Sequence, residues 1–304
     1  MSSKVIERET VQADAVPARR LRGNGTPWRE RFFHLSLWAS LAVGVVFLAT
    51  LLVYVVVQGW PRLDPRLWEN FPDIIDPGNA GAQSAIMGTV WVIGFTALYC
   101  IPTGVLTAIY LEEYADHDRW WNRAIEINIQ NLAAVPSIVY GILGLGIISR
   151  GLGFGQTVLT ASLTLSLLVL PVVIISSREA IRAVPNSIRQ ASLALGATQW
   201  QTIWRQVLPA SVPGMATGSI LALSRAIGEA APLLLLGGLT FITFNPTGAQ
   251  SAFTVLPIQI FNWISQSRAE FTALASAAIV ILLAILLLMN SVAIWLRNRF
   301  SRSW

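Results

Sequence analysis

The chain has very few of the residues that soluble enzymes use most often for chemistry. It contains one cysteine and two histidines among 304 residues, and Lys4 is its single lysine. A lone cysteine, Cys100, excludes an intrachain disulfide and a cysteine-based metal cluster. The histidines, His34 and His117, stand near the ends of different apolar segments and have no zinc-ligand spacing. No metal site is therefore predicted.

Two sequence signatures of catalysis are also missing. A phosphate-binding loop of the GxxxxGK[ST] type needs a lysine, and Lys4 lies in a polar N-terminal stretch without that pattern. The GxSxG pattern of a nucleophile elbow does not occur either. The chain is therefore predicted to be neither an ATPase nor a hydrolase, and to bind no cofactor itself.

Charged residues are scarce as well, which indicates that lipid rather than water surrounds much of the chain. Charged residues make up 12% of the sequence and apolar residues 54%, and the mean hydropathy is +0.59. A bilayer core about 30 Å thick needs roughly 20 apolar residues per helix. The predicted fold class is an all-α integral membrane protein with six transmembrane helices, at residues 33–58, 84–111, 125–148, 155–177, 213–239 and 271–296.

The basic residues are distributed by loop, which predicts a topology rather than nucleic-acid binding. Sixteen of the 21 basic residues lie in the N-terminal segment, the second and fourth loops and the C-terminal tail, and only four lie in the alternate loops. The positive-inside rule then predicts that both termini are cytoplasmic. An even number of spans agrees with this.

Two regions of different composition are expected. Residues 1–30 carry many charges and few large apolar side chains, which is typical of a disordered cytoplasmic arm. Residues 31–300 form the transmembrane domain. The first apolar run begins too late and is too long for a signal peptide, so it is expected to remain as a helix.

Several polar or helix-breaking residues near the spans allow more than one interpretation. Pro136, Pro171 and Pro232 can interrupt helices near a transport cavity, or packing can accommodate them. Glu112 and Glu113 end the second span, and we expect them to be solvated charges at the cytoplasmic surface.

A polar segment between the fourth and fifth spans, residues 187–208, predicts a cytoplasmic hairpin of two short helices. Ser187 followed by Gln190 fits a capping box at the start of the first helix. Gly196 is expected to end that helix.

The second helix of this hairpin has its own signals. Thr198 followed by Gln201 repeats the capping pattern, and Pro209 is expected to close the helix. An apolar stripe at helical spacing comprises Trp200, Ile203, Trp204 and Val207. The stripe is compatible with a pair of helices on the membrane surface and with a knob that docks into a partner protein.

Arg225 is a charge in the middle of an apolar run. It follows Pro213 by twelve residues, which corresponds to roughly 18 Å of helix and a position near the bilayer centre. An arginine there costs about 2.5 to 3.5 kcal/mol and almost always faces a bundle interior or an aqueous cavity. Glu229 follows at i+4 and can partner it. The pair is either a structural ion pair or part of a transport path, where a guanidinium suits phosphate oxygens.

The hairpin resembles the cytoplasmic loop of ABC-importer permeases. The family pattern is Glu-Ala-Ala, a glycine four residues later and Leu-Pro twelve residues beyond it, and QASLALGATQWQTIWRQVLP follows this spacing. The matching residues are Ala191, Gly196, Leu208 and Pro209, and the departures are Gln190, Ser192 and Gln206. The resemblance implies that the hairpin, with Gln190 and Trp200 on it, sits in a groove of an ATPase subunit and transmits its closure.

Longer segments are similar to the PstA-type permeases of the bacterial high-affinity phosphate ABC importer. These segments are NLAAVPSIVYGILGLG, LSRAIGEAAPLLLLGG, FTVLPIQIFNWIS and the hairpin. The resemblance implies a MetI-like fold in the bacterial inner membrane and a substrate path that includes Arg225 and Glu229. It also implies four kinds of partner besides the lipid bilayer: a paralogous PstC-type permease, a dimeric PstB-type ATPase that holds ATP and Mg, a periplasmic PstS-type binding protein, and inorganic phosphate.

Two alternative functions stay open at this point. The cargo of the same importer can be sulfate, molybdate or a polar amino acid. The chain can also be a membrane sensor or scaffold in phosphate signalling, whose hairpin docks a regulator in place of an ATPase.

Overall fold

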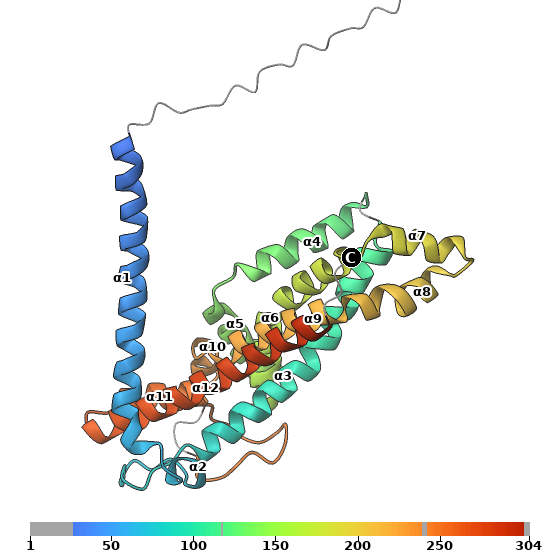
Figure 1. Ribbon diagram of the computed structural model, residues 1–304. Coiled ribbons are helices and arrows are strands. Elements are labelled where there is room, and N and C mark those ends of the chain that lie inside the picture. Colours follow the sequence, from blue (N-terminus) through green and yellow to red (C-terminus); the bar gives the residue numbers. More distant parts are fainter. Residues whose placement is uncertain (1–26, 117, 239–241, 301–304) are drawn as a thin grey trace, which may run out of the picture. The chain divides into compact units, whose positions relative to one another are not determined.

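The computed structural model describes residues 27–116, 118–238 and 242–300, and all regular elements within these ranges are helices (Figure 1). The chain divides into two compact units, residues 1–51 and 52–304. Most of the predicted N-terminal arm lies outside the described residues. Residues 27–30, which were predicted to belong to that arm, already form the first turn of α1 (Pro27–Gly59).

The second unit contains the remaining helices. Long apolar helices alternate there with short ones: η1 (Trp60–Arg62), α2 (Arg66–Glu69), α3 (Gln83–Ile109), η2 (Tyr110–Tyr114), α4 (Trp120–Ala133), α5 (Ser137–Leu143), η3 (Gly144–Gly151), α6 (Val158–Arg182), α7 (Asn186–Ala194), α8 (Gln199–Thr202), η4 (Ile203–Val207), α9 (Leu208–Ile227), α10 (Ala231–Leu235), α11 (Leu256–Ile264) and α12 (Ala269–Phe300). Of these, η2, η3 and η4 are π-helical turns. In the described residues, five helical segments are long and apolar enough to cross a membrane, and the bent pair α4 with α5–η3 makes a sixth candidate.

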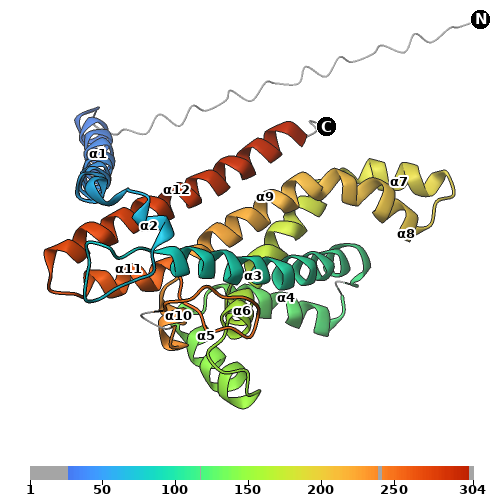
Figure 2. The same cartoon turned by 90° about the horizontal axis from the view of Figure 1, so that it is seen from below.

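The helices α3, α9 and α12 extend side by side across the second unit (Figure 2). Small hydroxyl residues fix α3 against α6: Thr96 donates to the Ser162 carbonyl at 3.3 Å, and Ser166 donates to the Thr96 carbonyl at 3.3 Å. Ser162 also donates to the Val92 carbonyl at 3.1 Å, so Val92 pairs with Ser162 and Thr96 with Ser166; because both numbers rise together, α3 and α6 run in the same direction. Hydroxyl-to-carbonyl contacts of this kind are a recurrent means of helix association in lipid, where hydrophobic expulsion is absent.

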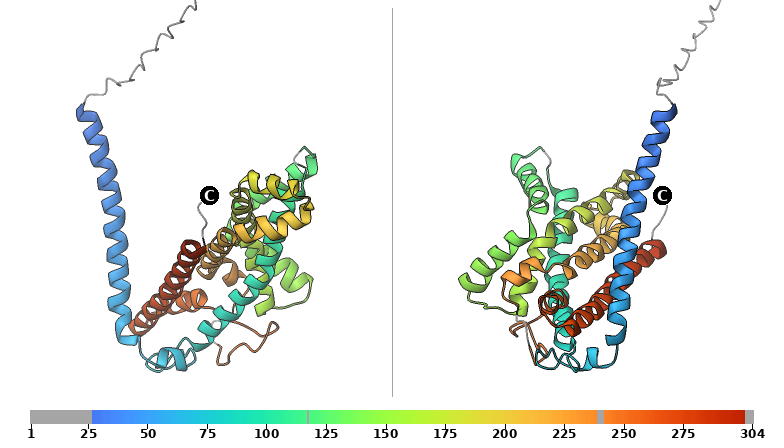
Figure 3. Two further views of the ribbon diagram at one scale, coloured as in Figure 1. Left: turned by 45° about the vertical axis from the view of Figure 1, so that its right-hand side comes forward. Right: turned by 90° about the vertical axis from the view of Figure 1, so that its left-hand side faces the viewer.

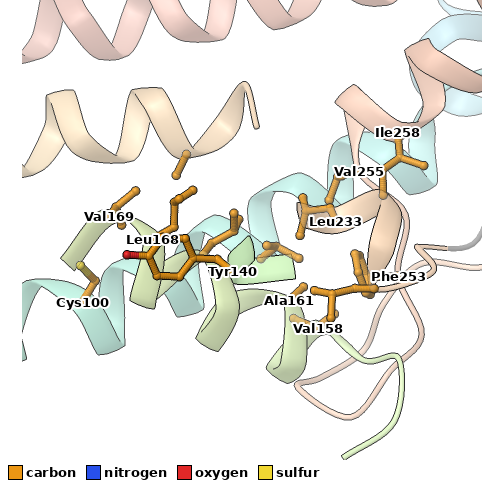
Figure 4. Packing of buried hydrophobic residues seen from close by; sticks show 14 of the residues in the cluster. Cys100, Tyr140, Val158, Ala161, Leu168, Val169, Leu233, Phe253, Val255 and Ile258 are labelled. Carbon is orange, nitrogen blue, oxygen red and sulfur yellow. The ribbon is translucent and has the colours of Figure 1, made fainter. Parts of the chain in front are cut away.

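The largest buried cluster lies where α3, α6 and α10 meet (Figure 4). It contains Cys100 of α3, Val169 of α6 and Leu233 of α10, and the segment before α11 adds Phe253. Cys100 is therefore a small core residue, as an unpaired cysteine in an apolar span usually is.

The third predicted span, 125–148, is broken next to Pro136, which is one of the two outcomes that the sequence allowed for this proline. The helices α4 and α5 meet at an angle of 106° across the break at 134–136. Pro136 has no N–H to donate and disfavours helical geometry in the residue before it, which explains the break. The hydroxyl of Tyr140 donates to the Leu132 carbonyl at 2.8 Å, so a carbonyl near the break gains a partner.

The fifth span differs from its predicted range, 213–239, in a similar way. The helix α9 ends at Ile227, and after a gap of three residues α10 continues in a new direction, with Pro232 in its first turn. Proline within a helix collides with the carbonyl four residues before it, which here belongs to Gly228. Gly141 of α5 packs directly against Pro232, so the breaks in the third and fifth spans lie close together. Pro171, by contrast, stays inside α6.

Candidate transport and coupling sites

The cytoplasmic hairpin predicted at 187–208 consists of α7 and α8, joined by a short turn (yellow in Figure 3). Gly196 has φ = +82°, a left-handed conformation in which glycine carries no steric cost. The Ala197 N–H bonds the Ser192 carbonyl, and the Gly196 N–H bonds the Leu193 carbonyl. This is the Schellman arrangement, so the prediction that Gly196 ends the first helix is confirmed.

The two predicted capping boxes have different outcomes. Thr198 and Gln201 form one at the start of α8: the Gln201 N–H donates to Thr198 Oγ1, and the Thr198 N–H donates to Gln201 Oε1. The box predicted at Ser187 is absent, because α7 begins one residue earlier, after Pro185, and its N-cap has no side-chain bond. Pro185 supplies the entry to this helix through its own restricted φ.

The prediction that Pro209 closes the second hairpin helix is wrong. Helix runs without a gap from Gln199 to Ile227. The π-helical turn η4 lies directly before Leu208 and Pro209, in a register where hydrogen bonds reach one residue further back, and α9 begins there with proline in its first turn. The hairpin is thus continuous with the fifth span.

The wide turn also divides the predicted apolar stripe into two faces. Ile203 and Val207 are buried, whereas Trp200 and Trp204 are exposed and stack edge to face, with ring centroids 5.3 Å apart. Leu195, at the tip of the hairpin, is 90% exposed. Gln190 is also exposed on α7. The hairpin therefore presents apolar side chains that none of the described residues covers.

A groove of about 460 Å³ lies beside this exposed tip. Ala191 and Leu195 of α7 and Gln201 and Arg205 of the following helix line it. Ala191 is the one residue of the predicted docking set that lines this groove. Leu208 is buried and Pro209 exposed, so those two residues lie on different faces of the helix that follows.

An ion network joins the hairpin to the spans. Arg189 of α7 donates to Glu113 Oε1 at 2.7 Å and to the carbonyls of Ile181 and Val184 at the end of α6. Gln199 of α8 donates to the Glu113 main-chain carbonyl at 2.5 Å. These contacts bring together the end of α3, the end of α6 and both hairpin helices.

A second part of the network lies one residue away, on Glu112. Its carboxylate accepts from Arg178 Nε at 2.7 Å and from Arg182 Nη2 at 2.7 Å. Arg178 also donates to Glu126 of α4 at 2.8 Å. The side chains of Glu112 and Glu113 are each only 9% exposed, so the prediction that they are solvated surface charges is wrong.

These network residues are the functional candidates that the sequence interpretation missed. A partial signal exists, because Arg178 and Arg182 stand at helical i+4 spacing and two carboxylates end another span. The separation between donors and acceptor, 66 and 70 residues, gives no indication that they meet.

Arg225 lies at the middle of the helical bundle. Gly214 packs on Ala180 and Gly218 on Ser176, so α9 runs antiparallel to α6. Continuing that register places Arg225 level with Val169, close to the centre of α6 (Val158–Arg182). On the other side, Thr217 contacts the Ala293 carbonyl, and the same count places Arg225 near the centre of α12 (Ala269–Phe300).

The Arg225 side chain is 60% exposed at this depth, and its Nε lies 3.7 Å from Glu229 Oε1. Glu229 does not continue α9 as predicted, because the helix ends two residues before it and Glu229 lies in the break that precedes α10. The two predicted path residues are therefore brought together, in a discontinuous span. Half-helix ends at mid-membrane are a usual setting for transport sites.

No group of three or more histidine, cysteine or acidic side chains suited to a metal ion occurs among residues 27–116, 118–238 and 242–300.

Gly214 and Gly218, which stand four residues apart on α9, contact α6 within this chain. Small residues at these positions let the two backbones approach closely.

Comparison with known proteins now identifies the family. Residues 100–303 match the family described as "binding-protein-dependent transport system inner membrane component". The chain belongs to this family. The permease is 32% identical over 252 residues to the phosphate transport system permease protein PstA 1 of Mycobacterium tuberculosis strain H37Rv, covering 82% of this chain and 81% of that protein. The resemblance to PstA-type permeases is thus confirmed.

Solved structures show the same fold for the permease. A chain of a bacterial alginate ABC transporter, in complex with an alginate pentasaccharide-bound periplasmic protein, superposes with a TM-score of 0.62 at 16% identity, covering 91% of this chain and 99% of that one. A chain of the inward-facing MetNI methionine ABC transporter has a TM-score of 0.56 at 18% identity, covering 73% and 95%. The MetI-like, multi-pass membrane fold is confirmed.

Proposed function

We propose that this permease is the membrane subunit of an ATP-driven importer of inorganic phosphate. The observation that carries the proposal is Arg225, a guanidinium exposed from this chain at the middle of the bundle beside a broken helix. An arginine facing lipid at that depth is costly, so an aqueous path or a second subunit must cover it. The 32% identity to a protein named as a phosphate permease supports phosphate as the cargo.

Arg225 and Glu229 have complementary tasks in this proposal. The planar fork of the guanidinium donates paired hydrogen bonds to two oxygens of one phosphate. Glu229, 3.7 Å away, holds the side chain when no anion is present and weakens the hold on a passing anion. Weak, transient binding is needed, because a path must release its ion.

The remaining subunits are part of the same proposal. The exposed Leu195, Trp200 and Trp204 suit a groove on a PstB-type ATPase dimer, which holds ATP and Mg and supplies the energy. A PstC-type permease would cover the Arg225 face, and a periplasmic PstS-type protein would deliver phosphate. We propose the bacterial inner membrane as the location, with both termini in the cytoplasm, as the loop charges favour.

The first prediction concerns Arg225. Arg225→Gln removes the charged fork at nearly the same size, and hydrogen bonds to charged groups contribute about 1.5 to 3 kcal/mol, so uptake of labelled phosphate should fall about tenfold or more. The complex should assemble at the wild-type level, because within the described part of the chain Arg225 forms an ion pair with Glu229 alone.

Arg150→Gln is the matched control, since it makes the same chemical change in an exposed arginine at the end of η3. Normal phosphate uptake by Arg225→Gln would refute the path assignment. Competition by unlabelled sulfate and molybdate in the same assay tests the cargo: uptake that sulfate or molybdate suppresses better than phosphate would assign the importer to another oxyanion.

A further inference from the structure

The inner end of α3 carries two consecutive buried carboxylates that face different elements. Glu112 and Glu113 lie in the π-helical turn η2, and the structure buries both side chains to the same extent. A buried carboxylate is stable only when charged donors compensate it. The donors on each one therefore identify which elements this turn holds together.

Glu113 holds the hairpin. Arg189 reaches it with Nε at 3.1 Å and Nη2 at 2.7 Å, while the remaining donors of Arg189 bond the Ile181 and Val184 carbonyls and the Asn186 side chain. Gln199 adds a bond to the Glu113 main chain from α8. Both helices of the hairpin are therefore bound to one residue at the end of α3.

Glu112 holds the spans. It accepts from Arg178 and Arg182, which lie one turn apart on α6, and Arg178 extends the contact to Glu126 of α4. Because Glu112 and Glu113 are neighbours in one helical turn, a movement of the η2 backbone displaces both carboxylates. The pair thus links the hairpin to α3, α4 and α6 through short charge-assisted bonds.

A second connection from the hairpin is the continuous helix from α8 through η4 into α9. Residues 183–185 likewise join α7 to α6, but no backbone connection leads directly from the hairpin to α3 or α4. We propose that Glu113 is a positioning residue for coupling: it passes movement of the hairpin to α3, and through Glu112 to α4 and α6, so that the spans move with α9 as one body.

This inference rests on the proposed function, and its main test uses the whole importer. The complex with its ATPase and second permease is purified from its own host and reconstituted in liposomes with the loaded binding protein. Phosphate imported per ATP hydrolysed is measured for wild type and Glu113→Gln. The ratio is expected to fall about tenfold while ATP hydrolysis continues, because glutamine keeps the size and loses the charge-assisted clamp.

Glu179→Gln is the matched control, since Glu179 pairs with Arg182 on the same end of α6 but is exposed, and its ion pair does not involve the hairpin. Its ratio should equal wild type. The double variant Glu113→Gln with Arg189→Gln should be no worse than Arg189→Gln alone, because both single variants remove the Glu113–Arg189 ion pair and Arg189→Gln also removes the bonds to the Ile181 and Val184 carbonyls. An unchanged ratio in Glu113→Gln, or losses that add in the double variant, would overturn the proposal.

A second measurement does not depend on the cargo. In a Cys100→Ala background, spin labels at Tyr110→Cys and Leu195→Cys report the distance between η2 and the hairpin tip in the assembled complex. We expect one narrow distance distribution with and without ATP in the wild type, and a broader, ATP-dependent one in Glu113→Gln. Identical distributions would refute the positioning role. A wild-type complex that moves no phosphate would refute the proposed function alone.

Discussion

At the scale of single residues, Arg178 has the most deeply buried charged side chain in the described part of the protein. Only 7% of its side chain is exposed, and it compensates two carboxylates, Glu112 and Glu126. Removing one partner of a buried ion pair costs about 3 to 5 kcal/mol, because the remaining charge stays buried without compensation. We therefore expect Arg178→Ala to lower the free energy of unfolding by this amount, measured by denaturant titration in detergent.

Arg182→Ala is the control for this prediction, because Arg182 shares the acceptor Glu112 but is 54% exposed. An exposed ion pair contributes about 0 to 1 kcal/mol, and Arg178 would still compensate Glu112. Equal losses in the two variants would mean that burial does not control the energetics of this network.

Residue positions were predictable from the sequence where counting along one helix suffices. The depth of Arg225 follows from its distance along an apolar run, and the register with α6 and α12 gives the same depth. The tasks of Glu112 and Glu113 were not predictable, because their donors lie 66 and 76 residues away. A carboxylate at the end of a span has the same local sequence whether water solvates it or arginine side chains from other helices bind it.

At the scale of elements, the hairpin is built to present its tip. The Schellman turn at Gly196 leaves Leu195 90% exposed and without packing in this chain. Leu195→Asp should therefore change the stability of the isolated chain by less than about 0.5 kcal/mol, as exposed substitutions usually do. The same variant should fail to retain the ATPase during co-purification, because a carboxylate would be desolvated in an apolar groove.

Ile75→Asp provides the comparison, since Ile75 is 88% exposed in the loop at the opposite end of α3 and receives the same change. It should retain the ATPase fully. If Leu195→Asp also retains it, the hairpin tip is not the docking surface.

The sequence named prolines that can interrupt a helix, but it did not determine which of them do. Proline occurs inside α3, α6 and α9, at Pro102, Pro171 and Pro213, without ending any of them. Pro136 and Pro232 lie at breaks: Tyr140 of α5 bonds the Leu132 carbonyl across the first, and Gly141 of α5 packs on Pro232 at the second. All five residues are prolines, so the residue type alone does not determine whether a helix continues or ends there. The contacts around each proline differ between the two groups.

At the scale of the whole molecule, the direction of α3 relative to α6 determines how the bent pair between them must run. The contacts of Ser162 with Val92 and of Ser166 with Thr96 show that the two helices are parallel. A chain that leaves the C-terminal end of α3 must return to the membrane side of its N-terminal end before it enters α6. The helices α4 and α5 with η3 therefore cross the membrane once, as a broken span, and a re-entrant loop is incompatible with this register.

Cysteine accessibility in a Cys100→Ala background tests this crossing. Asp118→Cys lies before α4 and Leu152→Cys directly after η3, and both side chains are exposed. In intact cells, an impermeant thiol reagent should label Leu152→Cys as it labels Asp73→Cys in the loop before α3. Asp118→Cys should react only after permeabilisation, as should Leu195→Cys on the hairpin. Labelling of Leu152→Cys together with Asp118→Cys would mean that the pair turns back within the bilayer, and the six-span count would then fall to five.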